Sequence, residues 1–334
     1  MSPRTPLVHW VPRLVLDGGA VLEDVRQAYH LDGALDAERG NLVLVFHALT
    51  GSADAAGDWW REIIGAGKAI DTRRWAVLAP NLLGSCYGTT GPSTWGRGAF
   101  PTVTPRDMAR LAWQLVDAIG ARTVALAVGG SLGGMVAQEF ALLAPERVRR
   151  TVALAAPAAH TAYAIGWNHV QREAVRLGGA AGLALARMVG MMTFRTEAEL
   201  GLRFGRAAGE DGRFDVQRYL ARHGEKLVAR FDAATYVTLL DAMDAHDVGR
   251  GRGGVDAALR VLAGRVVGVG IPGDLLYGAD EVRRWTAAAG GDYREIESVH
   301  GHDAFLIEHE QVGRILREAL DAAGRESEDS LCVA

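Results

Sequence analysis

The chain of 334 residues has few cysteines, no excess of either charge and no long hydrophobic run. Its two cysteines, Cys86 and Cys332, are far apart and fit no zinc or disulfide pattern, which favours a reducing compartment. Lys and Arg number 36 against 40 Asp and Glu, and the absence of a basic block argues against a nucleic-acid partner. The apolar stretch 123–137 is too short to cross a bilayer, and residues 1–6 lead into no apolar segment. We therefore expect a soluble, cytoplasmic protein that binds no membrane.

Short, continuous apolar runs are abundant, and they predict the sheet. Runs that are apolar throughout are typical of parallel strands buried on both faces by helices. A helical pattern at 105–119, opening on Thr104 as an N-cap, separates two of these runs. Residues 14–29 alternate around Asp17-Gly18-Gly19 and predict an edge hairpin. We expect a mostly parallel α/β sheet with strands at 41–46, 75–80, 123–128, 152–155, 266–271 and 293–297.

The buried-strand pattern disappears between residues 158 and 254, where amphipathic helical stretches such as Gly182–Met192 and Phe214–Phe231 take its place. This segment lies between two strands, so we expect a helical lid over the carboxyl edge of the sheet, where α/β folds bind ligands. Residues 1–157 and 255–323 would then form the core domain. The polar tail 324–334 is predicted to be disordered.

The sequence Gly129-Gly130-Ser131-Leu132-Gly133 fits the G-x-S-x-G pattern between a predicted strand and a predicted helix. In this setting the serine sits on a sharp turn as a nucleophile, and glycines on either side let the chain fold that tightly. A dinucleotide fingerprint needs a glycine where Ser131 stands, and a P-loop needs a lysine that is missing. A glycine-rich helix–sheet contact with an incidental serine stays open as the alternative.

A nucleophilic serine requires a histidine base and an orienting carboxylate, in the chain order Ser, Asp, His. Asp274 follows the strand at 266–271, and His302 follows the strand at 293–297, so both are expected at the carboxyl edge. His300 is the alternative base, and Asp280 is the alternative acid, although Asp280 fits a helix start better. The string His300–Asp303 lacks the spacing of a metallo-hydrolase site, so we expect no metal.

An oxyanion site is expected from two backbone amides, one after the nucleophile and one in the loop after an early strand. These are the amides of Leu132 and, within His47–Gly51, of Leu49. His47 itself fits equally well a histidine that merely ends a strand.

Five strings occur in order along the chain: His47–Ser52, Gly67–Thr72, Asn81–Pro92, Gly129–Met135 and Gly301–Leu306. Together they resemble one family of the α/β-hydrolase superfamily, the homoserine O-acyltransferases, and in particular the homoserine O-acetyltransferases. The resemblance extends over about residues 40–320 and implies an α/β-hydrolase fold: a mostly parallel central sheet, helices on both faces and an inserted helical lid. Ordinary esterases carry the G-x-S-x-G turn but not the whole set.

The resemblance implies a ping-pong transfer of an acetyl group from acetyl-CoA, a co-substrate, to the hydroxyl of L-homoserine in methionine biosynthesis, with no bound cofactor and a homodimeric enzyme. Ser131, His302 and Asp274 would form the triad. Arg187, in Gly182–Met188, matches the residue that pairs with the amino acid's carboxylate, and Asp303 matches the one that receives its ammonium group. A charged partner for each end suits a poorly hydrated site. The alternative for Arg187 is a solvated arginine on a helix, and the alternative for Asp303 is a carboxylate that caps a loop.

Two segments depart from the family pattern. The departure at 176–181 bears on the identity of the acyl acceptor, and the departure at Gly273–Tyr277 bears on the acyl donor. Succinyl-transferring relatives tend to have an arginine near Leu276, and an apolar residue there favours acetyl. L-Serine as acceptor, succinyl-CoA as donor and a plain carboxylesterase or thioesterase remain alternatives, as does a non-enzymatic binding protein. Asn168 and Arg172 also match a family string, with no role assigned.

Overall fold

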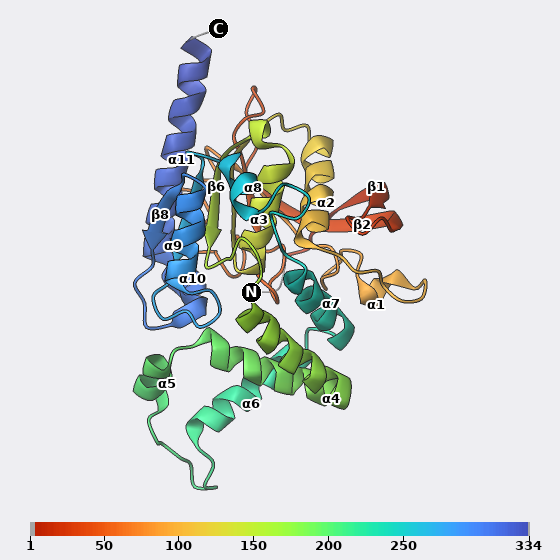
Figure 1. Cartoon of the computed structure of the whole chain (residues 1–334), viewed down its shortest axis with the longest axis vertical. Helices are drawn as coiled ribbons and strands as arrows, with labels where there is room; N and C mark the ends of the chain where they lie inside the picture. The colour runs from red at the N-terminus through yellow and green to blue at the C-terminus, as the bar shows by residue number, and fades with distance from the viewer. Residues whose placement is uncertain (1–3, 333–334) are drawn as a thin grey trace.

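The described residues form one eight-stranded sheet that is parallel except near one edge (Figure 1). The computed structural model describes residues 4–332, with side chains to residue 325. β1 pairs antiparallel with β2 and β2 with β4, whereas every other neighbouring pair is parallel. The order across the sheet is β1 (Leu7–Val15), β2 (Val21–Asp32), β4 (Ala76–Pro80), β3 (Leu42–Phe46), β5 (Val124–Gly130), β6 (Val148–Leu154), β7 (Val266–Gly270) and β8 (Asp292–Glu295).

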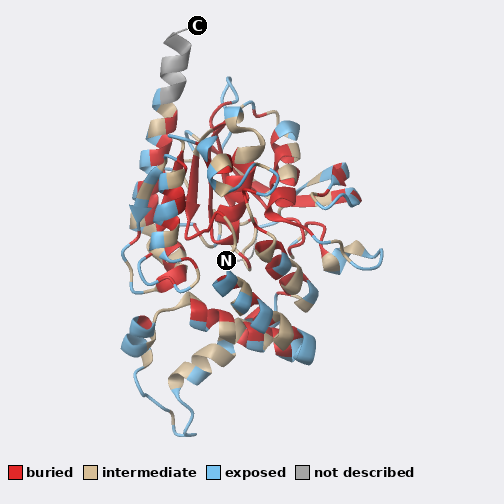
Figure 2. Cartoon of the chain, in the orientation of Figure 1, coloured by how far each residue is buried: buried red, intermediate tan, exposed pale blue. Residues whose placement is uncertain are grey.

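The central strands are covered on both faces, as their sequences predict. Every residue of β3, β4 and β5 is buried, and the strands are the most uniformly buried part of the chain in Figure 2. One face packs against α2 (Pro105–Ala118), α3 (Leu132–Leu143), α8 (Val255–Arg260) and α9 (Ala279–Ala288). The other packs against α11 (His309–Cys332) and the loop segment 55–70. The predicted parallel α/β sheet is confirmed.

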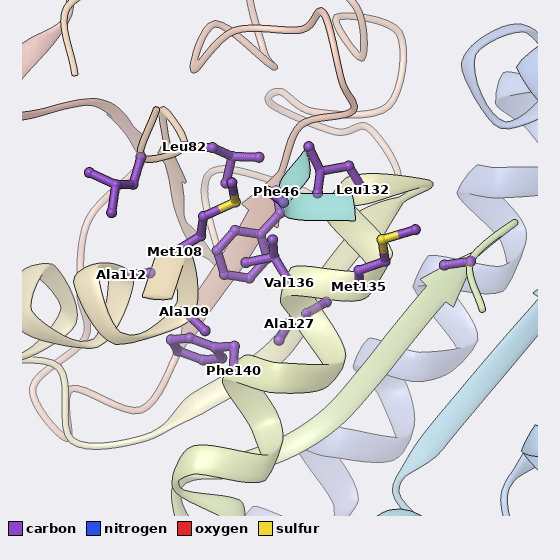
Figure 3. Close-up of a cluster of buried hydrophobic side chains, with 14 of the residues drawn as sticks. Phe46, Leu82, Met108, Ala109, Ala112, Ala127, Leu132, Met135, Val136 and Phe140 are labelled. Carbon is purple, nitrogen blue, oxygen red and sulfur yellow. The ribbon is translucent and has the colours of Figure 1, made fainter. Parts of the chain in front are cut away.

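The helix that follows Ser131 is anchored by a dense apolar cluster. In Figure 3, Val136 and Phe140 of α3 face Phe46 of β3 and the apolar side of α2. The Phe140 ring stacks on Trp113 at 4.2 Å between centroids and lies 5.6 Å from the Phe46 ring. Buried aromatic side chains of this kind each contribute about 1.5–3 kcal/mol. The position of the α3 N-terminus is therefore set by the core beneath it.

Two local predictions are confirmed beside this core. The hairpin β1–β2 turns at Asp17–Gly19, and β1 is an edge strand. Helix α2 begins after Thr104, whose side chain accepts a hydrogen bond from the Asp107 amide. The hairpin strands are longer than predicted: β1 extends back to Leu7, and this added part carries the exposed apolar side chains of Leu7, Val8 and Trp10. Two short helices, α1 (Pro92–Trp95) and α10 (Ala304–Ile307), lie within loops.

Strands β6 and β7 are neighbours in the sheet, and the chain between them leaves the sheet to form a helical layer. Helices α4, α5 and α6 lie together beyond the sheet in Figure 1, with α7 between them and the core. All four fall within residues 158–254, the range predicted for the lid, and no strand of the sheet interrupts them in this described segment. Their bounds are α4 (Ala162–Phe194), α5 (Glu197–Phe204), α6 (Asp215–Val228) and α7 (Ala233–Asp244).

Helix α4 is long and apolar enough to cross a membrane by length and composition alone. The helix includes Gly182–Met192, one of the amphipathic stretches predicted for the lid. The helix is broken at Gly179, whose φ of 52° and ψ of −121° are not helical, so two arms meet at a kink. Both α6 and α7 pack against α4, and polar side chains such as Asn168 and Gln171 are buried on it. These contacts are those of a helix inside the lid.

The tail 324–334, predicted to be disordered, is helical as far as residue 332. Helix α11 continues to Cys332, and only residues 333–334 of the predicted tail lie outside the described residues. The segment after Gly324 contains no proline and several good helix formers, so the helix that begins at His309 is free to propagate.

Candidate active site

Ser131 occupies the sharp turn between β5 and α3 that its sequence predicts. Its φ of 55° and ψ of −125° are a strained conformation for a residue with a side chain, of the kind that costs about 1–3 kcal/mol and clusters at functional sites. The turn needs glycine at its crossing points: a Cβ on Gly133 would lie 2.2 Å from the Phe46 carbonyl oxygen, and one on Gly129 would lie 2.3 Å from Gly133. This backbone holds Ser131 at the carboxyl end of β5.

His302 and Asp274 are brought together by two loops at the same edge of the sheet. His302 Nδ1 lies 2.8 Å from Asp274 Oδ2, and both side chains are buried. The second oxygen of Asp274 accepts hydrogen bonds from the amides of Leu276 at 2.8 Å and Tyr277 at 3.2 Å. Asp274 comes just after β7, and His302 lies in a 3₁₀ turn at Gly301–Asp303. The carboxylate is thus fixed before it orients the imidazole.

The electrostatics of this pair suit a base whose charged form is stabilised. Burial opposes the imidazolium of His302, but the charge of Asp274 and its hydrogen bond outweigh burial, so the pKa of His302 is raised above its ordinary value. Because Nδ1 faces the carboxylate, the proton is assigned to Nδ1, and Nε2 is left to act as the base.

The competing residues have other partners. His300 Nδ1 lies 3.2 Å from Glu199 Oε1 in the lid, and Asp280 stands in the first turn of α9. His300, His302 and Asp303 each face a different partner. Within the described residues, no group of three or more His, Cys, Asp or Glu side chains is placed to hold a metal ion.

A cavity of about 100 Å³ lies between the carboxyl edge of the sheet and the lid, with several times the space that one water molecule needs. Ser131 and His302 both line it, although these two described residues make no direct hydrogen bond to each other. The lid supplies Asn168 and Arg187 to its wall. Its other lining residues include Leu49, Thr50, Gln171, Phe194, Leu276, Tyr277, Asp303 and Phe305.

The two predicted oxyanion donors flank Ser131. Leu49 lines the cavity, whereas the Leu132 side chain is buried in the core beneath (Figure 3), so only its backbone amide can serve the site. Among the described residues, neither amide donates a hydrogen bond to another protein group. His47 shapes this loop: its Nδ1 lies 2.8 Å from the Ala48 carbonyl oxygen, and its Nε2 accepts a hydrogen bond from the Leu82 amide at 3.0 Å. Burial lowers the pKa of His47 to about 4, which keeps it neutral in this structural role.

Arg187 reaches the cavity from α4, where its guanidinium carbon lies 5.4 Å from the centre of the Phe194 ring. Burial lowers the pKa of Arg187, and the charge of Asp303 partly opposes this. Within the part of the chain that the structure describes, no carboxylate lies within 4 Å of this guanidinium, and it makes no hydrogen bond. The Arg187 guanidinium is thus a desolvated cation, and its partner within the protein is the face of the Phe194 ring.

Asp303 lines the same cavity, but it is not free. Its Oδ2 lies 3.1 Å from Nη2 of Arg195, which also contacts Glu199 at 3.1 Å. Arg187 and Asp303 are therefore brought to one cavity without forming an ion pair. This arrangement is compatible with the predicted roles, in which Arg187 pairs with the carboxylate of an amino acid and Asp303 with its ammonium group. Arg195, which contacts Asp303, was not among the predicted site residues.

Sequence reasoning missed Arg195 and Glu199, and it assigned no role to Asn168 and Arg172. Both of these last residues bind Asp244 on α7, Asn168 Nδ2 at 2.7 Å and Arg172 Nη1 at 2.6 Å. The partners are separated by about seventy residues of sequence, so no local pattern marks them. The same is true of Arg195 and Asp303, which come from the lid and the core.

The chain is similar to known proteins in sequence and in fold. Residues 41–230 match the family model of the alpha/beta hydrolase fold. The homoserine O-acetyltransferase of Thermus thermophilus is 46% identical over 89% of this chain and 86% of its own length. Among solved structures, a homoserine O-acetyltransferase from Staphylococcus aureus superposes with a TM-score of 0.82 at 30% identity over 95% of both chains. Esterase E22 superposes with a TM-score of 0.87 at 20% identity over 94% of this chain and 99% of its own, a likeness of fold alone.

Proposed function

Because the chain belongs to the homoserine O-acetyltransferase family of α/β hydrolases, we propose that it moves an acetyl group from acetyl-CoA to the side-chain hydroxyl of L-homoserine by a ping-pong mechanism. The observation that carries this proposal is Arg187, a desolvated cation without a carboxylate partner among the described residues, in the cavity that Ser131 and His302 share. A hydrolase of simple esters has no use for such a cation. An amino-acid acceptor supplies the missing carboxylate.

In the first half-reaction, Ser131 attacks the thioester carbon while His302 Nε2 takes the hydroxyl proton. The developing oxyanion is bound by the amides of Leu49 and Leu132, and one such donor contributes about 3–4 kcal/mol of transition-state stabilisation. His302 then returns the proton to the departing CoA thiolate, which leaves an acetyl ester on Ser131. Asp274 keeps the imidazole oriented and stabilises its charged form throughout.

In the second half-reaction, the acceptor enters the cavity with its carboxylate on Arg187 and its ammonium group on Asp303. His302 takes the proton of the acceptor hydroxyl as the oxygen attacks the acetyl ester, and returns it to Ser131 as the product leaves. A charged partner at each end of the amino acid directs its hydroxyl to Ser131. Transfer outruns hydrolysis when the reacting hydroxyl is held in place and water is excluded, which is the task of the lid.

The acyl donor is argued from the apolar part of the wall. Leu276 lines the cavity next to the triad loop, and its side chain offers no counter-ion to the second carboxylate of a succinyl group. We therefore propose acetyl-CoA as the donor, with no further cofactor. We also propose that the enzyme works in the cytoplasm as a homodimer and serves methionine biosynthesis.

A crossed assay tests the proposal directly. Purified enzyme is supplied with acetyl-CoA or succinyl-CoA and with L-homoserine, L-serine or buffer alone, and free CoA is followed with a thiol reagent. We expect CoA release that depends on L-homoserine and is fastest with acetyl-CoA. Release that is the same in buffer alone would identify a thioesterase and refute the transferase.

Intact mass spectrometry supplies the second arm of this test. After mixing with acetyl-CoA alone, the protein should gain one acetyl group, and L-homoserine should remove it. Ser131→Ala should carry no such adduct. An adduct that persists in Ser131→Ala would show that another residue is the nucleophile.

A further inference from the structure

A chain of polar contacts runs from the lid to the triad. It begins at Asp244, at the end of α7, whose carboxylate meets three groups: Asn168 Nδ2 at 2.7 Å, Arg172 Nη1 at 2.6 Å and His160 Nδ1 at 3.0 Å. His160 lies just before α4, and its side chain is fully buried. The Asp244 carboxylate thus links α7, the last helix of the lid, to the start of the lid and to the first half of α4.

The next contact crosses from the lid to the core. His160 Nε2 lies 3.0 Å from the hydroxyl oxygen of Tyr277, which stands three residues after Asp274. Because Nδ1 faces a carboxylate, the ring hydrogen is placed on Nδ1, so Nε2 accepts a hydrogen bond from the tyrosine hydroxyl. Burial raises the pKa of Tyr277 well above its ordinary value, which keeps that hydroxyl protonated.

Tyr277 touches the triad in two ways. Its amide donates a hydrogen bond to Asp274 Oδ1 at 3.2 Å. Its ring lies edge-on to the His302 imidazole, with centroids 5.4 Å apart and planes at 67°. Tyr277 also lines the cavity, so its ring forms part of the wall against which His302 sits.

We propose that Tyr277 and His160 are positioning residues that hold the Asp274–His302 pair in its working geometry, with Asp244 of the lid as their anchor. The inference rests on the proposed function, because it assigns these residues to the same acyl transfer. The imidazole has to stay between Asp274 and Ser131 in both half-reactions. The ring of Tyr277 prevents the His302 imidazole from rotating towards it. The Tyr277 ring is itself fixed because its hydroxyl is hydrogen-bonded to His160 of the lid.

Tyr277→Phe tests this with the smallest change, since it keeps the ring and removes only the hydroxyl. The measured quantity is the second-order rate constant for phosphonylation of Ser131 by a small p-nitrophenyl phosphonate, which needs the triad but neither CoA nor an amino acid. We expect a fall of about tenfold, the size of one lost hydrogen bond. The kcat for acetyl transfer should fall by a similar factor with KM for L-homoserine unchanged.

The matched control is Tyr293→Phe, which also removes one tyrosine hydroxyl and its hydrogen bond, here to Glu295 Oε1 at 2.8 Å, away from the cavity. It should leave both rates unchanged. Proton NMR gives a readout that a purely structural role would not move: the deshielded Nδ1–H signal of His302 should shift or broaden in Tyr277→Phe and not in Tyr293→Phe.

His160 is tested by replacing it with one residue that can accept a hydrogen bond and with one that cannot. His160→Gln retains an acceptor for the Tyr277 hydroxyl, and His160→Ala retains none, so Gln should restore part of the phosphonylation rate that Ala loses. If Tyr277→Phe leaves the phosphonylation rate, kcat and the His302 signal at their wild-type values, the inference is overturned. The proposed function fails in a different way: the wild-type enzyme would then not be labelled at Ser131, or would be labelled without transferring acetyl groups.

Discussion

Arg195 Nη2 lies 3.1 Å from Asp303 Oδ2, so the carboxylate that we propose as the ammonium partner already carries a cation on one oxygen. A carboxylate has two oxygens and about four acceptor positions, so this contact leaves Oδ1 for a second partner. Arg195 is itself balanced by Glu199. The acceptor's ammonium group therefore joins an existing ion network, and Arg195 holds Asp303 in one orientation before the acceptor binds.

Asp303→Asn and Glu199→Gln separate binding from stability. Each removes one carboxylate partner of Arg195, and each should lower the free energy of unfolding by about 1–3 kcal/mol because a poorly exposed cation loses a partner. Only Asp303 lines the cavity. We expect Asp303→Asn to raise KM for L-homoserine about tenfold or more and Glu199→Gln to change it little. Thermal unfolding and initial rates measure the two effects, and equal KM values in the two variants would contradict the role of Asp303.

The predicted contact between Arg187 and the acceptor's carboxylate can be tested with substrate analogues. Arg187→Ala should raise KM for L-homoserine by about one to two orders of magnitude, since it removes a charged hydrogen-bonding partner in a desolvated site. 3-Amino-1-propanol, which lacks the carboxylate, should be used equally poorly by both enzymes, whereas 4-hydroxybutyrate, which lacks the ammonium group, should still discriminate between them. Initial rates with the three acceptors are the measurement. An Arg187→Ala effect of the same size on 3-amino-1-propanol would assign the arginine a structural role.

The sequence predicts well what is encoded within a few residues. The buried strands are recognisable because β3, β4 and β5 are apolar at every position, and the turn at Ser131 because its glycines stand where a Cβ would meet backbone. Asp274 and His302 could be predicted because parallel strands end at one edge of the sheet, which brings the loops that follow them together. The ends of helices were harder: nothing in the sequence after Gly324 stops α11.

What the sequence could not predict are contacts between distant segments that no motif records. His160 and Tyr277 are 117 positions apart, and Arg195 and Asp303 are brought together only when the lid lies over the sheet. Each residue taken alone is an ordinary polar side chain on a helix or loop. The arrangement of the lid over the sheet, which determines these partners, depends on the kink at Gly179 and on packing between α4, α6 and α7.

The pH dependence of acylation should report on the Asp274–His302 pair. His302 has to be neutral to take the proton of Ser131, and its pKa is raised because Asp274 more than offsets burial. The rate of phosphonylation should therefore rise with pH through a midpoint above the ordinary histidine value of about 6.5. In Asp274→Asn only the charge of Asp303, the smallest of the effects that raise the pKa of His302, still opposes burial. The midpoint should therefore move to lower pH than in wild type, while the plateau falls by about 10⁴-fold.

The same shift has a consequence for stability, with a sign that can be checked. A folded-state pKa above the unfolded value contributes stability that is fully present below the unfolded pKa and is lost as pH rises through the folded one. The free energy of unfolding of wild type, compared with His302→Gln, should therefore show an advantage below about pH 6.5 that shrinks at higher pH. Urea titrations across this range measure it, and an advantage that grows with pH would mean that the folded-state pKa is lowered instead.

Gly133 tests whether the close approach at the turn is required for folding as well as for catalysis. A Cβ at this position would lie 2.2 Å from the Phe46 carbonyl oxygen, and that backbone is held inside the core, so neither atom can move away at low cost. We expect Gly133→Ala to lower the free energy of unfolding by about 3 kcal/mol or more and to abolish labelling of Ser131. Gly166→Ala is the matched control: it lies on an exposed part of α4 with nothing within 4 Å of its Cβ, and it should raise stability by about 0.5–1 kcal/mol through helix propensity. Chemical denaturation of the two variants beside wild type decides the question, because a Gly133→Ala protein as stable as Gly166→Ala would mean that the turn can relax and that its glycines are not structurally required.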